Sequence, residues 1–228
     1  MKNASLLLLL FATNLILAQQ SERLEDSIHI YWQPKLKLKY DDFKFDGKKE
    51  NNAELYCEKI KLCACAATNM NVIIDIPKKK RNKNHLEKIY IVAVFEKDKS
   101  YKFNNDTIGL IRQKLSFDIE EWATRYARQQ LEKTTNQFNI KYGSIITWHK
   151  VILNEAQAKK KELFKQYTLD VYLEPKMNAD KDWRYKIDNL LEGLKEYATK
   201  PEDCNRFILK KPVERDYEQF IVLDDRHK

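Results

Sequence analysis

Glycine and histidine are scarce in this chain. Its 228 residues include four Gly and four His, against 42 Lys plus Arg and 34 Asp plus Glu. Gly-rich phosphate loops, dinucleotide-binding fingerprints and propeller repeats need more glycine than this, so nucleotide-binding enzymes of those classes are excluded. Hydrophobic residues make up 43% and aromatic residues 11% of the chain. This content is enough for a folded core and excludes intrinsic disorder of the whole chain.

Long hydrophobic runs are also rare, and the one that is present lies at the start. An uncharged, Leu-rich stretch from Ala4 to Ala18 follows Lys2 and is too short to span a bilayer as a mature helix. The pattern is typical of a secretory signal peptide over residues 1–18, whereas a buried N-terminal helix would need an amphipathic period that this run lacks. We therefore expect a periplasmic or secreted protein that does not span the membrane once the signal is removed, with residues 19–228 as a single domain.

Hydrophobic periodicity changes once along the mature chain. Alternating or β-rich segments at 28–45, 55–66, 71–76 and 88–95 predict an N-terminal antiparallel sheet of about four strands. A helical period follows and predicts long helices over 107–135, 148–168 and 180–198. The buried stripe of the first helix is expected to contain Ile108, Ile111, Leu115, Ile119, Trp122 and Tyr126. Strands followed by helices indicate an α+β fold, and residues 200–228 form either a last strand or a tail.

Basic residues exceed acidic ones by eight. Their densest run, residues 78–83 (KKKRNK), lies between two strand-like segments and contains no aromatic side chain on which a base could stack. We interpret this run as a solvated hairpin loop and expect no nucleic acid partner.

Four cysteines, Cys57, Cys63, Cys65 and Cys204, suit an oxidising compartment. On a single strand, Cys57 would lie about 20 Å from Cys63, beyond the roughly 7 Å Cα separation of a disulfide. A direct bond between Cys63 and Cys65 would be strained. The disulfide that geometry favours joins Cys204 to one of the other three, and a zinc site built on Cys-Ala-Cys is the alternative.

Several motifs occur in a fixed order along the chain. The first lies in Trp32 to Phe43, the second in Ala93 to Tyr101 and the third in Leu110 to Arg128, and a Trp-x-x-x-Ile pattern follows at Trp183. Together they resemble the bacterial family of predicted secreted zinc-dependent proteases, domain of unknown function nine-two-two. Its opening pattern is matched by Trp32, Leu38, Tyr40, Asp42 and Phe43. The resemblance implies a zincin-like fold for most of residues 28–195.

The active-site helix of that family reads Leu-Leu-x-His-Glu-Gln-x-His-Phe-Asp-Ile. A zinc site of this kind needs two His one turn apart and a Glu that deprotonates the metal-bound water. The matching positions here are Arg112, Gln113 and Ser116: a permanent cation, a side chain that cannot accept a proton and a weak neutral ligand. The family's downstream His falls in residues 168–174, where this chain has none. We therefore expect no catalytic residues, no metal ligands and no cofactor.

These observations favour an exported, catalytically inactive metalloprotease-like protein. Its former cleft, with Arg112, Gln113 and Asp118, or else its basic surface, is expected to bind an unknown protein or peptide of the cell envelope. One alternative is a metal-dependent or acid/base hydrolase with a displaced site that uses Asp118 together with a Cys or His. Another is a structural or assembly protein of the envelope whose long basic helices bind a partner. Glu120 and Glu121 are expected on the solvated face of the first helix.

Overall fold

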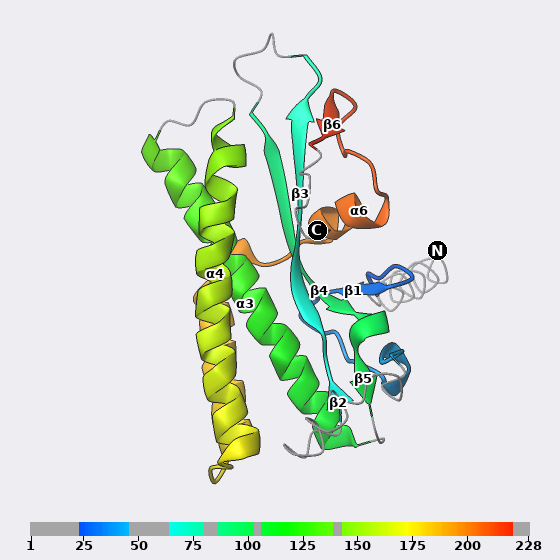
Figure 1. Cartoon of the computed structure of the whole chain (residues 1–228), viewed down its shortest axis with the longest axis vertical. Helices are drawn as coiled ribbons and strands as arrows, with labels where there is room; N and C mark the ends of the chain where they lie inside the picture. The colour runs from blue at the N-terminus through cyan, green and yellow to red at the C-terminus, as the bar shows by residue number, and fades with distance from the viewer. Residues whose placement is uncertain (1–22, 46–63, 80–85, 103–105, 139–142, 221–228) are drawn as a thin grey trace, which may run out of the picture.

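The computed structural model describes residues 23–45, 64–79, 86–102, 106–138 and 143–220. Within them a four-stranded antiparallel sheet has the strand order β1–β4–β3–β6 (Figure 1). Its strands are β1 (His29–Tyr31), β3 (Thr68–Pro77), β4 (Lys88–Glu96) and β6 (Tyr217–Gln219). A second, two-stranded sheet pairs β2 (Ala64–Cys65) with β5 (Tyr101–Lys102).

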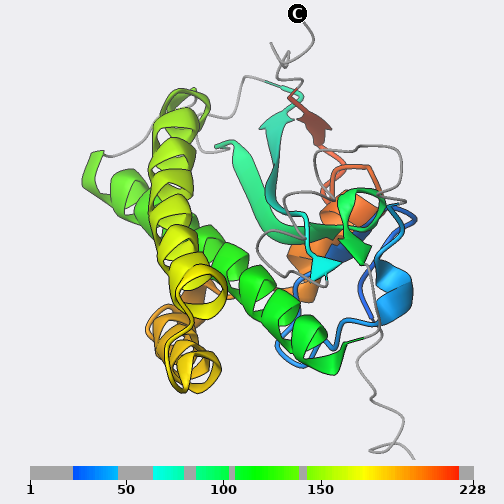
Figure 2. The same cartoon turned by 60° about the horizontal axis from the view of Figure 1, so that its bottom comes forward.

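Helices cover both faces of the four-stranded sheet. They are α3 (Thr107–Phe138), α4 (Ser144–Thr168), α5 (Ala179–Glu192) and α6 (Pro201–Ile208). Single helical turns occur at η1 (Tyr40–Asp42), η3 (Lys97–Lys99), η4 (Leu169–Leu173, a π-helical turn) and η5 (Lys195–Tyr197). Figures 1 and 2 show α3 between α4 and the sheet, with α6 on the opposite face. None of the helices in these described ranges is long and apolar enough to cross a membrane.

The predicted α+β class is confirmed, and the long helices lie where the periodicity places them. The first helix begins at Thr107 because the side chain of Asp106 accepts hydrogen bonds from the backbone N–H groups of Ile108 and Gly109, both at 3.1 Å. In α5 the expected apolar residues Trp183, Ile187 and Leu191 are buried.

The composition of the sheet differs from the prediction. Its fourth strand is β6, from the C-terminal end, rather than a strand over 55–66. Of that segment, residues 55–63 lie outside the described part, and Ala64–Cys65 pairs with β5. Strand β1 is also shorter than predicted. Pro34 has no N–H to pair, and the N–H of Leu36 donates to the carbonyl of Gln33 in a turn.

Burial along α3 differs from the expected pattern in two ways: some of the apolar residues are exposed, and some of the charged residues are buried. Ile108 and Ile111 are 55% and 60% exposed, whereas Glu120 and Glu121 are completely buried. The buried face of α3 is therefore rich in polar residues. Such a face is stable only where each polar group finds a partner, and those partners come from segments far along the chain.

The C-terminal segment contributes a helix, α6, and a strand, β6. Residues 201–219 are therefore part of the fold rather than a tail. Arg206 on α6 is completely buried and donates two hydrogen bonds of 2.7 Å to the carboxylate of Asp75 on β3. A third bond, 3.1 Å long, joins Arg206 to the side chain of Gln219 on β6. One guanidinium thus ties α6 to two neighbouring strands.

The predicted disulfide of Cys204 is not present in the structure, where this thiol is free. Cys204, on the buried side of α6, packs among Tyr31, Val92 and Phe207, and burial raises its pKa to about 12. Ala64, next to Cys65, belongs to the cluster on the other face of the sheet, so the sheet separates these two segments. The other two expected partners, Cys57 and Cys63, lie outside the described residues.

We predict that the buried ion pair makes a large contribution to stability. Arg206→Met leaves the Asp75 carboxylate buried without a counter-charge, which costs about 3–5 kcal/mol of unfolding free energy. Denaturant unfolding measures this loss. The double variant Arg206→Met with Asp75→Leu should recover much of it, because both charges are then gone. Lys99→Met, which breaks an exposed pair with Glu96, should cost less than about 1 kcal/mol. Equal losses for Arg206→Met and Lys99→Met would contradict the assigned role.

Candidate functional site

Three buried carboxylates on α3 organise the region that the sequence singles out. Asp118 accepts hydrogen bonds from Trp32 Nε1 at 2.7 Å and from Arg184 Nη1 on α5 at 2.6 Å, and it also pairs with Lys114. The neighbouring carboxylates of Glu120 and Glu121 face other partners. Asp118 is therefore held by cations from its own helix and from α5.

Glu120 joins α3 to α4 and to the start of β3. Its Oε2 accepts hydrogen bonds from Lys160 Nζ at 2.8 Å and from Thr68 Oγ1 at 3.1 Å. Its Oε1 is buried and has no hydrogen-bond partner among the described residues. Glu121 pairs with Arg125 at 2.9 Å and also accepts bonds from the N–H and the hydroxyl of Thr199. The prediction that Glu120 and Glu121 are solvated is wrong because each carboxylate has its own buried partners.

The three positions that match the family's zinc motif are all engaged in structural contacts. Arg112 donates two hydrogen bonds of 2.8 Å to Asp180 on α5, and these bonds raise its pKa. Gln113 accepts a hydrogen bond of 2.8 Å from the N–H of Ala66. The hydroxyl of Ser116 donates to the carbonyl of Arg112, one turn earlier, at 3.2 Å.

The π-helical turn η4 completes this arrangement. Asp170 anchors the turn by accepting hydrogen bonds from Lys176 and Trp183, and the bond from Lys176 lowers its pKa. The turn presents Tyr172, whose ring lies 5.2 Å from the Arg112 guanidinium carbon and whose hydroxyl lies 3.5 Å from Gln113 Nε2. Burial raises the pKa of Tyr172 to about 12, so the phenol is neutral at physiological pH. The segment 168–174, expected to match the family's third ligand, thus lies beside two of the motif positions.

The residues expected to share one cleft are divided between two sides of α3. Arg112 and Gln113 meet at Tyr172, and Ser116 lines a groove beside them. Asp118 lies two residues after Ser116, which corresponds to about 200° around the helix axis. It lines a separate cavity next to α5.

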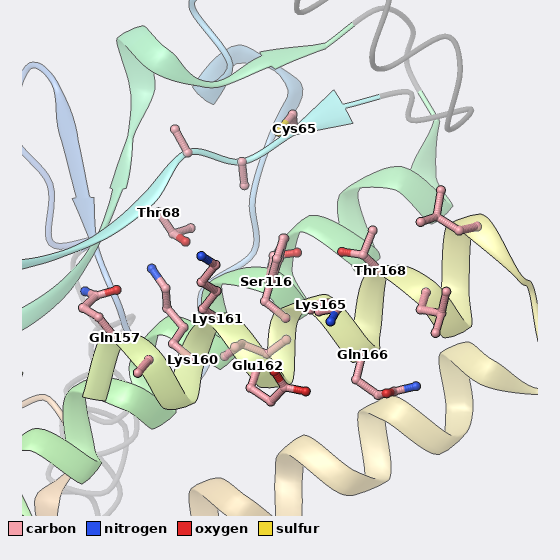
Figure 3. Close-up of a pocket in the computed structure, with 17 residues that line it drawn as sticks. Cys65, Thr68, Ser116, Gln157, Lys160, Lys161, Glu162, Lys165, Gln166 and Thr168 are labelled. Carbon is pink, nitrogen blue, oxygen red and sulfur yellow. The ribbon is translucent and has the colours of Figure 1, made fainter. Parts of the chain in front are cut away.

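The groove beside Ser116, which we name the α4 groove, has a volume of about 990 Å³ (Figure 3). One wall is the segment 65–68, the other is the second half of α4, and Ser116 and Ile119 of α3 form the floor. In Figure 3 the side chains of Lys160 and Lys161 extend from α4 toward Thr68. The α4 groove therefore has a basic helix wall opposite a polypeptide strand.

From Thr68 in this wall onward, β3 has backbone hydrogen-bonding groups that no strand in the described ranges uses. Thr68, Met70 and Val72 stand opposite Phe95, Ala93 and Ile91 of β4. The carbonyls of Ala93 and Ile91 bond away from β3, to Trp32 and to Arg128, so these are the non-bonded pairs of the antiparallel ladder. The N–H and C=O groups of Thr68, Met70 and Val72 consequently point to the open edge. Within the described part of the chain, β6 and the residues that flank it cover this edge only from Ile74 to Lys78.

The motif positions do not fit a zinc ion. Arg112 is cationic and paired, Gln113 already accepts a backbone N–H, and Ser116 is a neutral hydroxyl, so they do not form the set of anionic or imidazole donors that Zn²⁺ requires. Among the described residues, no three His, Cys, Asp or Glu side chains are grouped closely enough to hold a metal ion. His149 is buried, with its Nδ1 at 3.2 Å from the carbonyl of Ile145, as expected for a structural His.

Sequence reasoning missed the residues that give this site its shape: Thr68, Lys160 and Tyr172. Thr68 precedes a predicted strand, and Lys160 belongs to the run of three lysines at 159–161. A Lys run on a helix normally indicates a solvated face. Nothing in the local pattern shows that Lys160 meets a Glu forty residues away.

We predict a structural role for Gln113, at the position where the family has its catalytic Glu. Gln113→Leu should lower the unfolding free energy by about 1–3 kcal/mol, because the N–H of Ala66 loses its acceptor. Gln113→Glu keeps an acceptor oxygen and should cost less. The same change at a half-exposed position of α3, Gln129→Leu, is the control in denaturant unfolding. If Gln113→Leu were no more destabilising than Gln129→Leu, the hydrogen bond between Gln113 and Ala66 would make no measurable contribution to stability, and the assigned role would be wrong.

Comparison of the chain with protein family models, with curated proteins and with solved structures gives no match.

Proposed function

We propose that this protein is an exported, catalytically inactive relative of metalloproteases whose α4 groove binds an extended polypeptide segment. The observation that carries the proposal is the open edge of β3, which begins at Thr68 in the wall of the groove, near the former motif positions. An extended peptide can add to such an edge as a further strand, with its main chain bonded to the edge and its side chains in flanking pockets.

The lining of the α4 groove favours an acidic and partly apolar segment. Lys161 and Lys165 are exposed, and neither makes an ion pair with a described residue. Both are therefore available to a ligand carboxylate. Phe164 and Leu173 are 41% and 52% exposed on the same lining and offer apolar contacts. Alternating acidic and apolar side chains on a bound strand would match both features, because successive side chains of a strand point to opposite faces.

The condition of the motif positions supports binding rather than hydrolysis. Arg112 and Gln113 join α3 to α5 and to the segment 65–68, and the hydroxyl of Ser116 is bonded to a carbonyl of its own helix, so none of the three is placed to activate water. A hydrolase with a displaced site on Asp118 is less favoured. That carboxylate already accepts bonds from Trp32, Lys114 and Arg184, so both of its oxygens are engaged in contacts within the fold.

We predict that a fluorescein-labelled peptide of about ten alternating Glu and Val residues, roughly one strand long, binds the protein and that Thr68→Pro weakens it. Proline removes the outward N–H of Thr68 at the first position of β3, where the β4 ladder does not use it. The loss of one hydrogen bond corresponds to about tenfold in Kd. Fluorescence polarisation measures the change.

Matched variants separate the strand edge from other causes. Thr68→Val removes the hydroxyl bonded to Glu120 but keeps the N–H, and it should leave Kd within about twofold of the original. Lys161→Gln with Lys165→Gln should weaken binding, whereas Lys133→Gln with Lys150→Gln, which removes equal charge from exposed positions elsewhere on α3 and α4, should not. An assembly protein that uses only its basic helices would respond equally to both double variants, and this result would overturn the proposal.

A further inference from the structure

A second hollow, which we name the α5 cavity, lies on the other side of α3. It has a volume of about 1040 Å³, is open to solvent and is bordered by the segment that begins at Trp32, by α3 and by α5. Asp118, rather than Ser116, belongs to its lining. The α5 cavity is therefore distinct from the α4 groove, and its chemistry is independent of the proposed peptide binding.

The lining of the α5 cavity is strongly basic. Six cations contribute to it, namely Lys35, Lys37, Lys114, Arg125, Arg184 and Lys195. They face three carboxylates, Asp118, Asp188 and Glu192, and Arg125 is also paired with Glu121 behind the lining. A formal excess of two positive charges remains. A concave surface of one charge sign concentrates ligands of the opposite sign.

The carboxylates in the α5 cavity are already committed to cations. Asp118 binds Lys114 and Arg184, Asp188 binds Arg184 at 2.6 Å, and Glu192 binds Lys195 at 2.6 Å. By contrast, Lys35 and Lys37 are exposed and make no ion pair with a described residue. They flank the buried Leu36, which fixes the backbone between them. Two unneutralised ammonium groups therefore stand over the cavity.

Arg184 supplies a further fixed cation. Its Nη1 and Nη2 groups bind Asp118 and Asp188, and its Nε–H is buried without an acceptor within the described part of the chain. The side chain as a whole is 35% exposed where it lines the cavity. The two ion pairs hold the guanidinium in place, so its charge is preorganised for a ligand.

The cations on the floor of the α5 cavity are also fixed in position. The Arg125 guanidinium carbon lies 4.9 Å and Lys114 Nζ lies 5.3 Å from the centre of the Trp32 ring. These cation–π contacts, with the bonds of Arg125 to Glu121 and to the carbonyl of Leu191, fix both side chains in the lining that they share with the two unpaired lysines. A lining that is fixed in this way lowers the ordering cost of binding an anion.

We infer that the α5 cavity binds a multiply charged oxyanion, a molecule with two or more phosphate or carboxylate groups spaced to reach both Arg184 and the Lys35–Lys37 pair. Phosphate esters and acidic sugars share this chemistry. Isothermal titration with inorganic tripolyphosphate and with a short oligogalacturonate distinguishes the two sources. Binding of either probe, weakening as ionic strength rises, supports the inference. Absence of heat from both at millimolar concentration overturns it.

Variants locate the binding. Lys35→Gln with Lys37→Gln should weaken the bound probe about tenfold, and Lys133→Gln with Lys150→Gln should leave it unchanged. Arg184→Lys retains the charge but lacks the planar fork, and it should also weaken binding about tenfold. Thermal unfolding monitors whether this variant stays folded. If it does not, the double variant Lys35→Gln with Lys37→Gln alone tests the assigned site. Equal weakening by both double lysine variants would show adsorption to a basic surface and would overturn the assigned site.

Discussion

The structure depends on the burial of three carboxylates within one turn of α3. Asp118, Glu120 and Glu121 are almost completely removed from solvent, and an unpaired buried carboxylate costs several kcal/mol. Each of them is therefore matched by a cation: Arg184 of α5, Lys160 of α4 and Arg125 of α3 itself. These pairs determine which side of α3 each neighbouring helix occupies. They also explain why a helix with so polar a buried face is stable.

Two of these cations also belong to the two proposed binding surfaces. Lys160 neutralises Glu120 and lines the α4 groove, and Arg184 neutralises Asp118 and lines the α5 cavity. The need to neutralise buried acids of α3 therefore places one fixed cation in each lining, and the unpaired lysines beside it supply the net positive charge. The motif positions Arg112 and Gln113 have a comparable role, since their bonds to Asp180 and Ala66 join α3 to its neighbours. In our proposal, a helix that once served chemistry now serves packing.

The α+β class, strands β3 and β4 and the long helices could be predicted because their hydrophobic periods are strong. The fourth strand could not, because Tyr217–Gln219 is short and is held in the sheet by Arg206 and Asp75, whose pairing spans 131 residues of the chain. The prediction of which α3 residues are buried was wrong for a related reason. Ile111 is apolar but exposed, whereas Glu120 is charged but buried beside Lys160. Periodicity reports the polarity of a side chain, whereas its burial depends on partners that only the tertiary fold supplies. The sequence therefore predicted which helix carries the candidate site. It did not predict which residues of that helix line the α4 groove and which line the α5 cavity.

Amide hydrogen exchange with and without the acidic peptide tests the central claim most directly, since it reports on the β3 edge itself. The account predicts slower exchange at Thr68, Met70 and Val72, whose N–H groups point to the open edge. It predicts no change at Asn69 and Asn71, which stand at the bonded positions opposite β4. Protection confined to the segment around Lys35 and Lys37, or no protection along β3 at saturating peptide, would contradict it.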